Sequence, residues 1–525
     1  MGVSSCSVAL VVVMMAIAAD GVVAGVTGAL PTQVLRERIV LDQKGRYVML
    51  WTPQENDIII EVQVATAGYV GLGFSPKGGM KGADIVMGWV DDSGRVMLHD
   101  QYSDGYTVPK VDESQDVELL GGYQNDTHTV LRFSRPWVTC DHNDIRLSGD
   151  TVRLVWFFAN EDPTDDMTMK DHDQQGERSI LLKEPTFVAP TLDDHTKAWE
   201  LLAPNVTLPH DLDTLYWCKL FKIPPIKSKN QFIGYTPVIQ EGNEQYVHHM
   251  VLFECKLPKS SLHYEKWLGV EGLQCYSSSM PRSWNHCKTP IMAWAVGSAG
   301  EMFPEHVGFP MGEEYDGATY YRMEVHYDNK DLKQGIVDAS GLRMFYTDIL
   351  RPHDAATVGF GHLVSPLHII PPGQRNWFTV GFCSGECTQQ LLPPDGIHVF
   401  QGLLHSHLLG RAISLRQIRN GRELPPLLVD KSYDFNYQQG RILRDEMTIL
   451  PGDSFITECD YDSGDRPNPT FGGLGTYEEM CVVYMSFYPR VNVTMCGSIP
   501  QPKNIYKSLG IEEMEEKQHY DAKHM

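Results

Sequence analysis

The chain has 525 residues, which is too long for one hydrophobic core and indicates about three domains. Its formal net charge of −23 argues against nucleic acid and against an anionic membrane surface as partners. With 46 glycines, 32 prolines and many β-branched and aromatic residues, the composition favours a mostly β protein with numerous turns.

The N-terminus carries an apolar block at residues 8–19 that is too short to span a bilayer comfortably. Small residues follow up to Ala24, which predicts a signal peptide over residues 1–24. No later segment of the sequence reaches the length of a membrane span. An uncleaved N-terminal segment is therefore the one route to membrane association that the sequence leaves open.

Sequons and cysteines indicate the secretory pathway. Three Asn-x-Thr sequons predict glycosylation, at Asn125, Asn205 and Asn492. Of the 11 cysteines, Cys6 lies in the signal segment, and the others are spread widely without the paired spacing of zinc modules. We expect disulfides, formed in an oxidising compartment. The predicted location is the lumen or membrane of the endoplasmic reticulum, or the outside of the cell.

Short strands recur from residue 35 onward, as at 57–64 and 129–133, and predict a β-sandwich over residues 35–150. The rest of the chain is then divided into a connector rich in Asp, Pro and Thr, two β-rich units and a charged tail, at 161–210, 211–352, 358–500 and 501–525.

His405 and His407 lie in the run 396–410, in which apolar and polar residues are interleaved as in a strand. Residues two apart on a strand point to the same face, so both imidazoles can reach one ion. Met480, between two acids and a β-rich run, is a candidate third ligand because a thioether suits Cu(I) and has little use for zinc. The alternative is that Met480 only fills a core.

A second set of candidate ligands lies earlier in the chain. His248 and His249 are adjacent in the predicted strand 246–253, so they can share an ion only if the backbone bends there. His326, on the predicted strand 321–327, would complete a site of three imidazoles, which suits copper or zinc. Taken alone, a His-His doublet is more often structural, but the two sets together predict two copper sites of different redox character.

The chain resembles the copper type II ascorbate-dependent monooxygenases over roughly residues 210–500. The matching stretches occur in family order: Tyr216-Trp-Cys218, His248-His-Met250, Glu324-Val-His-Tyr327, Pro393-Pro-Asp-Gly-Ile-His398, His405-Ser-His407 and Glu479-Met-Cys481. Residues 35–150 resemble the DOMON domain that precedes the hydroxylase core in the dopamine-β-hydroxylase-like branch of this family.

The resemblance implies a DOMON β-sandwich followed by two jelly-roll-like β-sandwich copper subdomains. It implies two copper ions per chain, ascorbate as the electron donor, and O2 as co-substrate for hydroxylation of a C–H bond. The implied ligands of the electron-transfer copper and of the O2-binding copper are, in turn, His248, His249 and His326, and His405, His407 and Met480. Tyr216 and His405 coincide with the family's catalytic residues.

The resemblance also implies four disulfides: Cys218–Cys275, Cys255–Cys287, Cys383–Cys496 and Cys459–Cys481. Cys140 and Cys387 are left over. They either pair with each other or with another chain, or they mark a shortened form of the protein.

Two positions depart from the peptide-hydroxylating members of the family. Leu403 and Val482 stand where those enzymes have polar residues that contact a substrate carboxylate. This predicts a small-molecule substrate, aromatic or an amine, rather than a glycine-extended peptide. We also expect His398 to orient a ligand or pack beneath it, and Tyr484 to lie near the substrate.

Two other functions compete with this interpretation. One is a catalytically silent DOMON and copper-core binding protein of the secretory pathway. The other, a zinc hydrolase, gives Met480 no role, and the sequence has no general-base glutamate in a zinc-binding helix.

Overall fold

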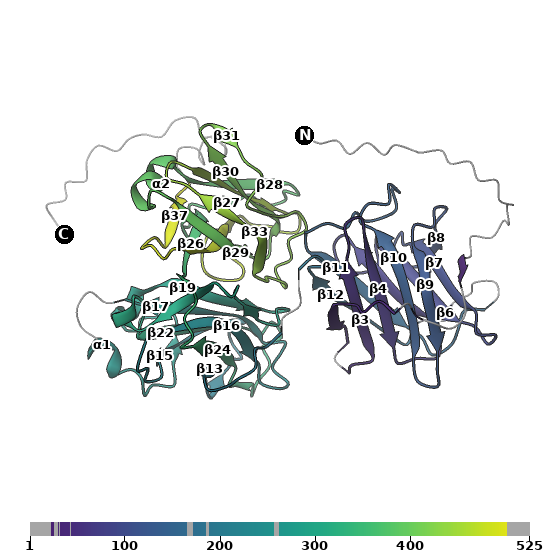
Figure 1. Ribbon diagram of the computed structural model, residues 1–525, viewed down its shortest axis with the longest axis horizontal. Helices are drawn as coiled ribbons and strands as arrows, with labels where there is room; N and C mark the ends of the chain where they lie inside the picture. The colour runs from purple at the N-terminus through teal and green to yellow at the C-terminus, as the bar shows by residue number, and fades with distance from the viewer. Residues whose placement is uncertain are drawn as a thin grey trace. The chain divides into compact units, whose positions relative to one another are not determined.

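The computed structural model describes residues 23–25, 30, 32–42, 44–164, 172–184, 188–256 and 262–500 (Figure 1). Most of the predicted signal segment and the charged tail lie outside these residues. The described chain is almost entirely β, as predicted, with two short α-helices, α1 (Leu262–Glu265) and α2 (Gly385–Leu391). No helix within these ranges is long and apolar enough to cross a membrane. The chain divides into two compact units between residues 186 and 187.

The first unit is a β-sandwich. One sheet has the order β2 (Glu37–Val40), β3 (Tyr47–Pro53), β4 (Asp57–Val64), β10 (Thr129–Pro136) and β9 (Glu118–Gln124). The other has the order β1 (Val23–Gly25), β7 (Val96–Tyr102), β6 (Asp84–Val90), β5 (Val70–Ser75), β11 (Val152–Phe158) and β12 (Gln174–Ile180), with β8 (Lys110–Val111) beside β7. Ile60, Val62 and Val64 lie two apart on β4 and are all buried in the core between the sheets.

A cluster of buried acidic residues lies on β6 and β7 of this unit. Asp84 pairs with the buried guanidinium of Arg135. Asp100 lies close by, and one of its oxygens, Oδ1, is buried without a hydrogen-bond partner. Burial, together with the neighbouring Asp84 charge, raises the pKa of Asp100 to about 8. The first unit therefore holds a buried carboxyl group whose pKa is raised well above that of an ordinary aspartate.

The stretch 161–210 is less of a connector than predicted. Strand β12 lies within it and pairs with β11 of the first unit. Strand β13 (Thr196–Leu202) also lies within it and pairs with β24 (Gly341–Thr347) of the second unit. The polar composition that suggested a linker belongs in part to an edge strand, β12, whose residues are mostly half-buried or exposed.

The second unit begins with a β-sandwich, drawn in teal in Figure 1. One of its sheets has the order β13, β24, β16 (Asn230–Val238), β21 (Val307–Met311) and β25 (His353–Asp354), with β20 (Glu301–Met302) beside β16. The other has the order β18 (Leu273–Gln274), β15 (Thr214–Lys222), β22 (Tyr320–Asp328), β17 (Val247–Cys255) and β19 (Cys287–Ala295).

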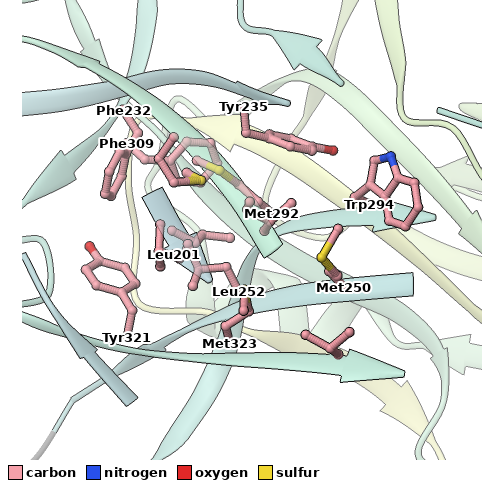
Figure 2. Packing of buried hydrophobic residues seen from close by; sticks show 14 of the residues in the cluster. Leu201, Phe232, Tyr235, Met250, Leu252, Met292, Trp294, Phe309, Tyr321 and Met323 are labelled. Atoms are coloured by element: carbon pink, nitrogen blue, oxygen red, sulfur yellow. The ribbon is translucent and has the colours of Figure 1, made fainter. Parts of the chain in front are cut away.

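Alternation along these strands separates core from site. On β17, Met250 and Leu252 point into the core, where Figure 2 shows them beside Met323 of β22. The residues that alternate with them, His249 and Val251, are on the opposite face of the sheet and line a cavity. The core packing of these strands therefore fixes which side chains reach the cavity.

A second sandwich, green to yellow in Figure 1, completes the unit. One sheet has the order β33 (Arg441–Ile449), β29 (Ile397–His405), β36 (Val482–Tyr488), β26 (Ala356–His362) and β37 (Met495–Ser498). The other has the order β28 (Trp377–Cys383), β34 (Ser454–Tyr461), β30 (Gly410–Arg419) and β31 (Arg422–Glu423), with β32 (Leu428–Asp430) beside β30.

Polar contacts join the two sandwiches of this unit. Arg490 donates to the buried carboxylate of Glu254 at 2.7 Å. The Tyr216 hydroxyl donates to the Leu474 carbonyl at 2.6 Å. Because these bonds are directional, they hold the β15–β22–β17–β19 sheet of one sandwich facing the β29–β36–β26 sheet of the other.

Candidate metal centre

The first set of predicted ligands comes together on β17 and β22. The pairing of β17 with β22 shifts register between Val247 and His249, so the backbone bends at the doublet as its sharing of an ion requires. His248 Nδ1 and His249 Nδ1 lie 3.1 Å apart. One ring nitrogen from each of His248, His249 and His326 lies within 4.8 Å of the others. The three imidazoles could therefore hold one ion.

His326 is oriented by its neighbours on both sides. Its Nε2 lies 2.7 Å from Thr214 Oγ1 and 3.0 Å from Thr476 Oγ1, while its Nδ1 is buried without a partner. Its ring stacks on Tyr216 with centroids 4.2 Å apart. A buried nitrogen that no protein group satisfies fits a metal ligand, because burial without a partner would otherwise be unfavourable.

The second set lies at the ends of β29 and β36. The His405 and His407 rings have centroids 5.2 Å apart. Strand β29 ends at His405, before the end of the run 396–410 that was predicted to be a strand. His407 therefore lies in the following turn rather than on the same strand face as His405. The two rings converge because the turn is held in place, not because of strand periodicity. Met480 is buried just before β36 and lines the same cavity as both histidines.

Hydrogen bonds fix the tautomers of these two histidines. His405 Nδ1 lies 2.7 Å from Gln438 Oε1, and His407 Nδ1 lies 3.0 Å from the Glu478 carbonyl oxygen. Carbonyl oxygens only accept, so each Nδ1 carries the proton and each Nε2 keeps a free lone pair. Gln438 Nε2 in turn donates to the Phe435 carbonyl at 2.9 Å, which orients the amide.

Glu479 ties the second set together, and sequence reasoning missed this role. Its buried carboxylate accepts bonds from the backbone N–H groups of His407 (2.9 Å), Leu409 (2.6 Å) and Met480 (3.2 Å), and from Ser406 Oγ (3.0 Å). Burial raises the pKa of Glu479 to about 7. The acid beside Met480 was the signal in the sequence, but its contacts depend on the turn after β29.

Burial keeps the histidines neutral. It lowers the pKa of His248 and of His407 to about 3, and it holds the pKa values of His249 and His326 well below the usual value. Neutral imidazoles have a lone pair to donate, which is the form that binds metal.

The two sets lie next to each other across the junction of the two sandwiches. The His249 and His405 rings have centroids 6.3 Å apart. Phe435 stacks on His248 at 4.3 Å and lies edge-on to His407 at 6.2 Å. One aromatic side chain thus contacts a histidine of each set.

A cavity of about 220 Å³ opens beside both sets. Its wall includes His249 from the first set and His405, His407 and Met480 from the second. The remaining lining is mainly apolar and aromatic, with Tyr216, Phe253, Met292, Trp294, Leu403 and Tyr484 among its residues. Val482 is buried and is not in this lining. Sites for small molecules have this character: an apolar concavity with a few placed polar groups.

Comparison with protein families matches this arrangement. Residues 199–334 match the copper type II ascorbate-dependent monooxygenase N-terminal domain, and residues 353–509 match the C-terminal domain. The chain belongs to the copper type II ascorbate-dependent monooxygenases. Residues 43–159 match the DOMON domain. The cofactors of this family are copper and ascorbate, with O2 as co-substrate.

Relatives in this family extend along most of the chain. The human DBH-like monooxygenase protein 1 is 41% identical over 91% of this chain and 77% of its own length. The MOXD1 homolog 1 of Drosophila melanogaster is 38% identical over 90% of this chain and 69% of its own length. The dopamine beta-hydroxylase of Rattus norvegicus is 33% identical over 88% of this chain and 73% of its own length.

Tyr484 was expected near the substrate and His398 near the metal ligands, and the structure places only Tyr484 at the cavity. Tyr484 lines the cavity, with its ring centroid 6.5 Å from that of His405, and burial raises its pKa to about 12. His398 does not orient a ligand: its ring stacks on Tyr488, and its Nδ1 bonds to Thr448. Seven residues of extended strand separate His398 from His405, which is too far for contact.

All four predicted disulfides are present, which fits folding in an oxidising compartment. Cys140 and Cys387 do not pair with each other, because Cys140 is disulfide-bonded and Cys387 is a free thiol. Cys387 Sγ lies 3.3 Å from Cys496 Sγ of the Cys383–Cys496 bond. The three sequon asparagines are exposed: Asn125, Asn205 and Asn492.

Proposed function

We propose that this chain is an active copper- and ascorbate-dependent monooxygenase that hydroxylates a C–H bond of a small aromatic or amine substrate with O2. One observation carries the proposal: two complete ligand sets, three imidazoles and two imidazoles with a thioether, lie beside one apolar cavity. Zinc has little use for a thioether, so the donor atoms favour copper over a hydrolytic metal.

The residues fit two copper ions. His248, His249 and His326 would hold one ion, and His405, His407 and Met480 the other. Hydrogen bonding leaves His248 Nε2, His326 Nδ1 and the Nε2 atoms of His405 and His407 without a partner among the described residues. Bound copper would supply one-electron chemistry and the activation of O2.

The protein's own groups would bind and orient. Gln438 and the Glu478 carbonyl hold the protons of His405 and His407 on Nδ1, and Glu479 fixes the turn between them. The apolar lining excludes water from the reacting C–H bond. Tyr216 closes the junction of the sandwiches through its bond to the Leu474 carbonyl, and we assign it a catalytic role beside His405.

The cavity supports a small substrate without a carboxylate. Leu403 lines the wall, and within the described part of the chain no lysine or arginine does. A carboxylate placed there would lose its hydration without gaining a counter-charge, which is unfavourable. We further propose that the protein works in the endoplasmic reticulum lumen or after secretion, supported by its four disulfides.

The test is copper content together with ascorbate-dependent O2 uptake on a panel of phenylethylamines and phenols. We expect two copper ions per chain in the wild-type protein, and one in His405→Ala and in Met480→Ala, with hydroxylation lost in both variants. His398→Ala is the matched control, since this histidine packs on Tyr488 outside the ligand sets. A wild-type protein that binds one copper ion or none would refute the proposal. Full loading without turnover of any substrate would favour a silent binding protein.

A further inference from the structure

Glu324 is a buried carboxylate in the wall of the cavity, and the function proposed above gives it no role. It lies on β22 two residues before His326, so both side chains leave the same face of the sheet. Its cross-strand neighbours are Val251 on β17 and Cys218 on β15. Glu324 therefore lies one step, about 7 Å, along the strand from the histidines.

One oxygen of this carboxylate is occupied and the other is open. Oε2 accepts a hydrogen bond from the Tyr276 hydroxyl at 2.5 Å and lies 3.8 Å from Arg322 Nη2. Oε1 has no hydrogen-bond partner among the described residues, and the residue lines the cavity although only 5% of it is exposed. A carboxylate oxygen without a donor beside a cavity can accept a hydrogen bond from a ligand there.

Arg322 supports the carboxylate from behind. Its guanidinium stacks over the Phe253 ring at 4.5 Å and donates weakly to the Trp284 carbonyl at 3.5 Å. Arg322 is not part of the cavity lining, so it cannot itself contact a bound molecule. Burial raises the pKa of Glu324, and the Arg322 charge and the Tyr276 hydrogen bond offset part of that rise.

Three tyrosines share the cavity lining with Glu324. Tyr216, Tyr276 and Tyr484 all line the cavity, and the Glu324 charge acts on the hydroxyls of all three. The Tyr216 and Tyr276 rings lie with centroids 6.3 Å apart at 66°. The faces of aromatic rings attract cations, as does a carboxylate. Aromatic rings together with a carboxylate suit a desolvated ammonium group.

The other acid of the cavity is not available in this way. Glu301 accepts hydrogen bonds from the Gln401 amide and the Gly440 backbone N–H. These donors come from the second sandwich, so Glu301 serves the junction between the sandwiches. Glu324 is the acidic residue in the lining with an oxygen to spare.

We propose that Glu324 is the specificity-determining residue of the cavity and binds the protonated amine of the substrate. The inference rests on the proposed function, because the rest of the substrate would extend from Glu324 toward His405 and Met480. It also gives a reason why a substrate carboxylate is excluded: it would meet the Glu324 charge as well as apolar Leu403.

The first experiment measures binding to the copper-free protein, so that it does not depend on turnover. The probes are 2-phenylethylamine, which is a cation at pH 7, and 2-phenylethanol, its neutral counterpart of similar shape. We expect the wild-type protein to prefer the amine. Glu324→Gln keeps an acceptor for Tyr276 but removes the charge, and should weaken amine binding about 10- to 100-fold with little effect on the alcohol. Glu324→Asp should retain part of the preference.

Glu265→Gln is the matched control, because Glu265 also accepts a hydrogen bond from a tyrosine, Tyr320, but lies outside the cavity lining, and it should leave the ratio of the two affinities unchanged. In the copper-loaded enzyme, Glu324→Gln should raise KM for the amine more than it lowers kcat, with two copper ions still bound. Equal affinity of the wild-type protein for both probes, or binding of neither, would overturn the proposal. So would equal losses for amine and alcohol in Glu324→Gln. If the monooxygenase proposal alone fails, the protein will bind no copper or show no turnover, but it will still prefer the amine to the alcohol.

Discussion

Replacing Glu479 by Gln tests how the second ligand set is held together. The carboxylate accepts four hydrogen bonds, three at Oε2 and one, from the Leu409 N–H, at Oε1. The amide of Gln has one acceptor oxygen. Its less disruptive orientation keeps the three bonds at the Oε2 position and sets its NH2 group against the Leu409 N–H.

The expected size follows from the bond that is lost. A hydrogen bond to a charged group contributes about 1.5–3 kcal/mol, and the remaining three lose their charge assistance. If the loosened turn is felt by His407 and Met480, copper affinity of the second set falls about 10- to 100-fold. The first set shares no hydrogen bond with Glu479 and should change less.

The assay is competition with a Cu(I) chelator, followed as copper ions retained per chain. At a chelator concentration where the wild-type protein keeps two ions, Glu479→Gln should keep one. The matched control is Glu478→Gln, because Glu478 is an exposed neighbour whose carboxylate accepts only from the Gly475 N–H at 2.8 Å. Retention of both ions in Glu479→Gln, or equal weakening of both, would refute this account of the turn.

Two further predictions concern other buried groups. In the full chain, measured without divalent cations, Asp100→Asn should raise the unfolding temperature of the first unit above pH 8. Below pH 4 the substitution should leave that temperature unchanged. The reason is that a folded-state pKa of about 8 lies above the unfolded value, so the neutral form stabilises at low pH and this is lost as pH rises toward 8. Gln438→Leu should weaken copper retention at the second set, because the His405 N–H loses its acceptor at 2.7 Å; unchanged chelator competition would contradict this.

The parts of the site that sequence reasoning reached are those set by local chemistry. A His-His doublet on a strand needs a bend to share an ion, and the structure has one between Val247 and His249. The soft donor Met480 was recognisable from its residue type, and its place just before β36 agrees.

The parts that it missed depend on contacts distant in sequence. His407 is aligned by Glu479, which lies 72 residues away. His398 was expected near the ligands because it shares their strand, but the strand carries it to Tyr488 instead. Gln438 could not be singled out, because a glutamine in a loop has no pattern that reveals its partner.

The free thiol of Cys387 lies within reach of the Cys383–Cys496 disulfide, so thiol–disulfide exchange would give a second covalent form. The Cys387 sulfur lies 3.3 Å from Cys496, so attack there would form a Cys387–Cys496 bond and release Cys383, whose thiolate takes up the proton. No oxidant is consumed and the mass does not change. Intact-mass measurement cannot distinguish these isomers, and only peptide mapping under acidic, non-reducing conditions reports which one a preparation contains. In either isomer β37 remains cross-linked to the chain at β28 or α2, so both keep the strand beside β26.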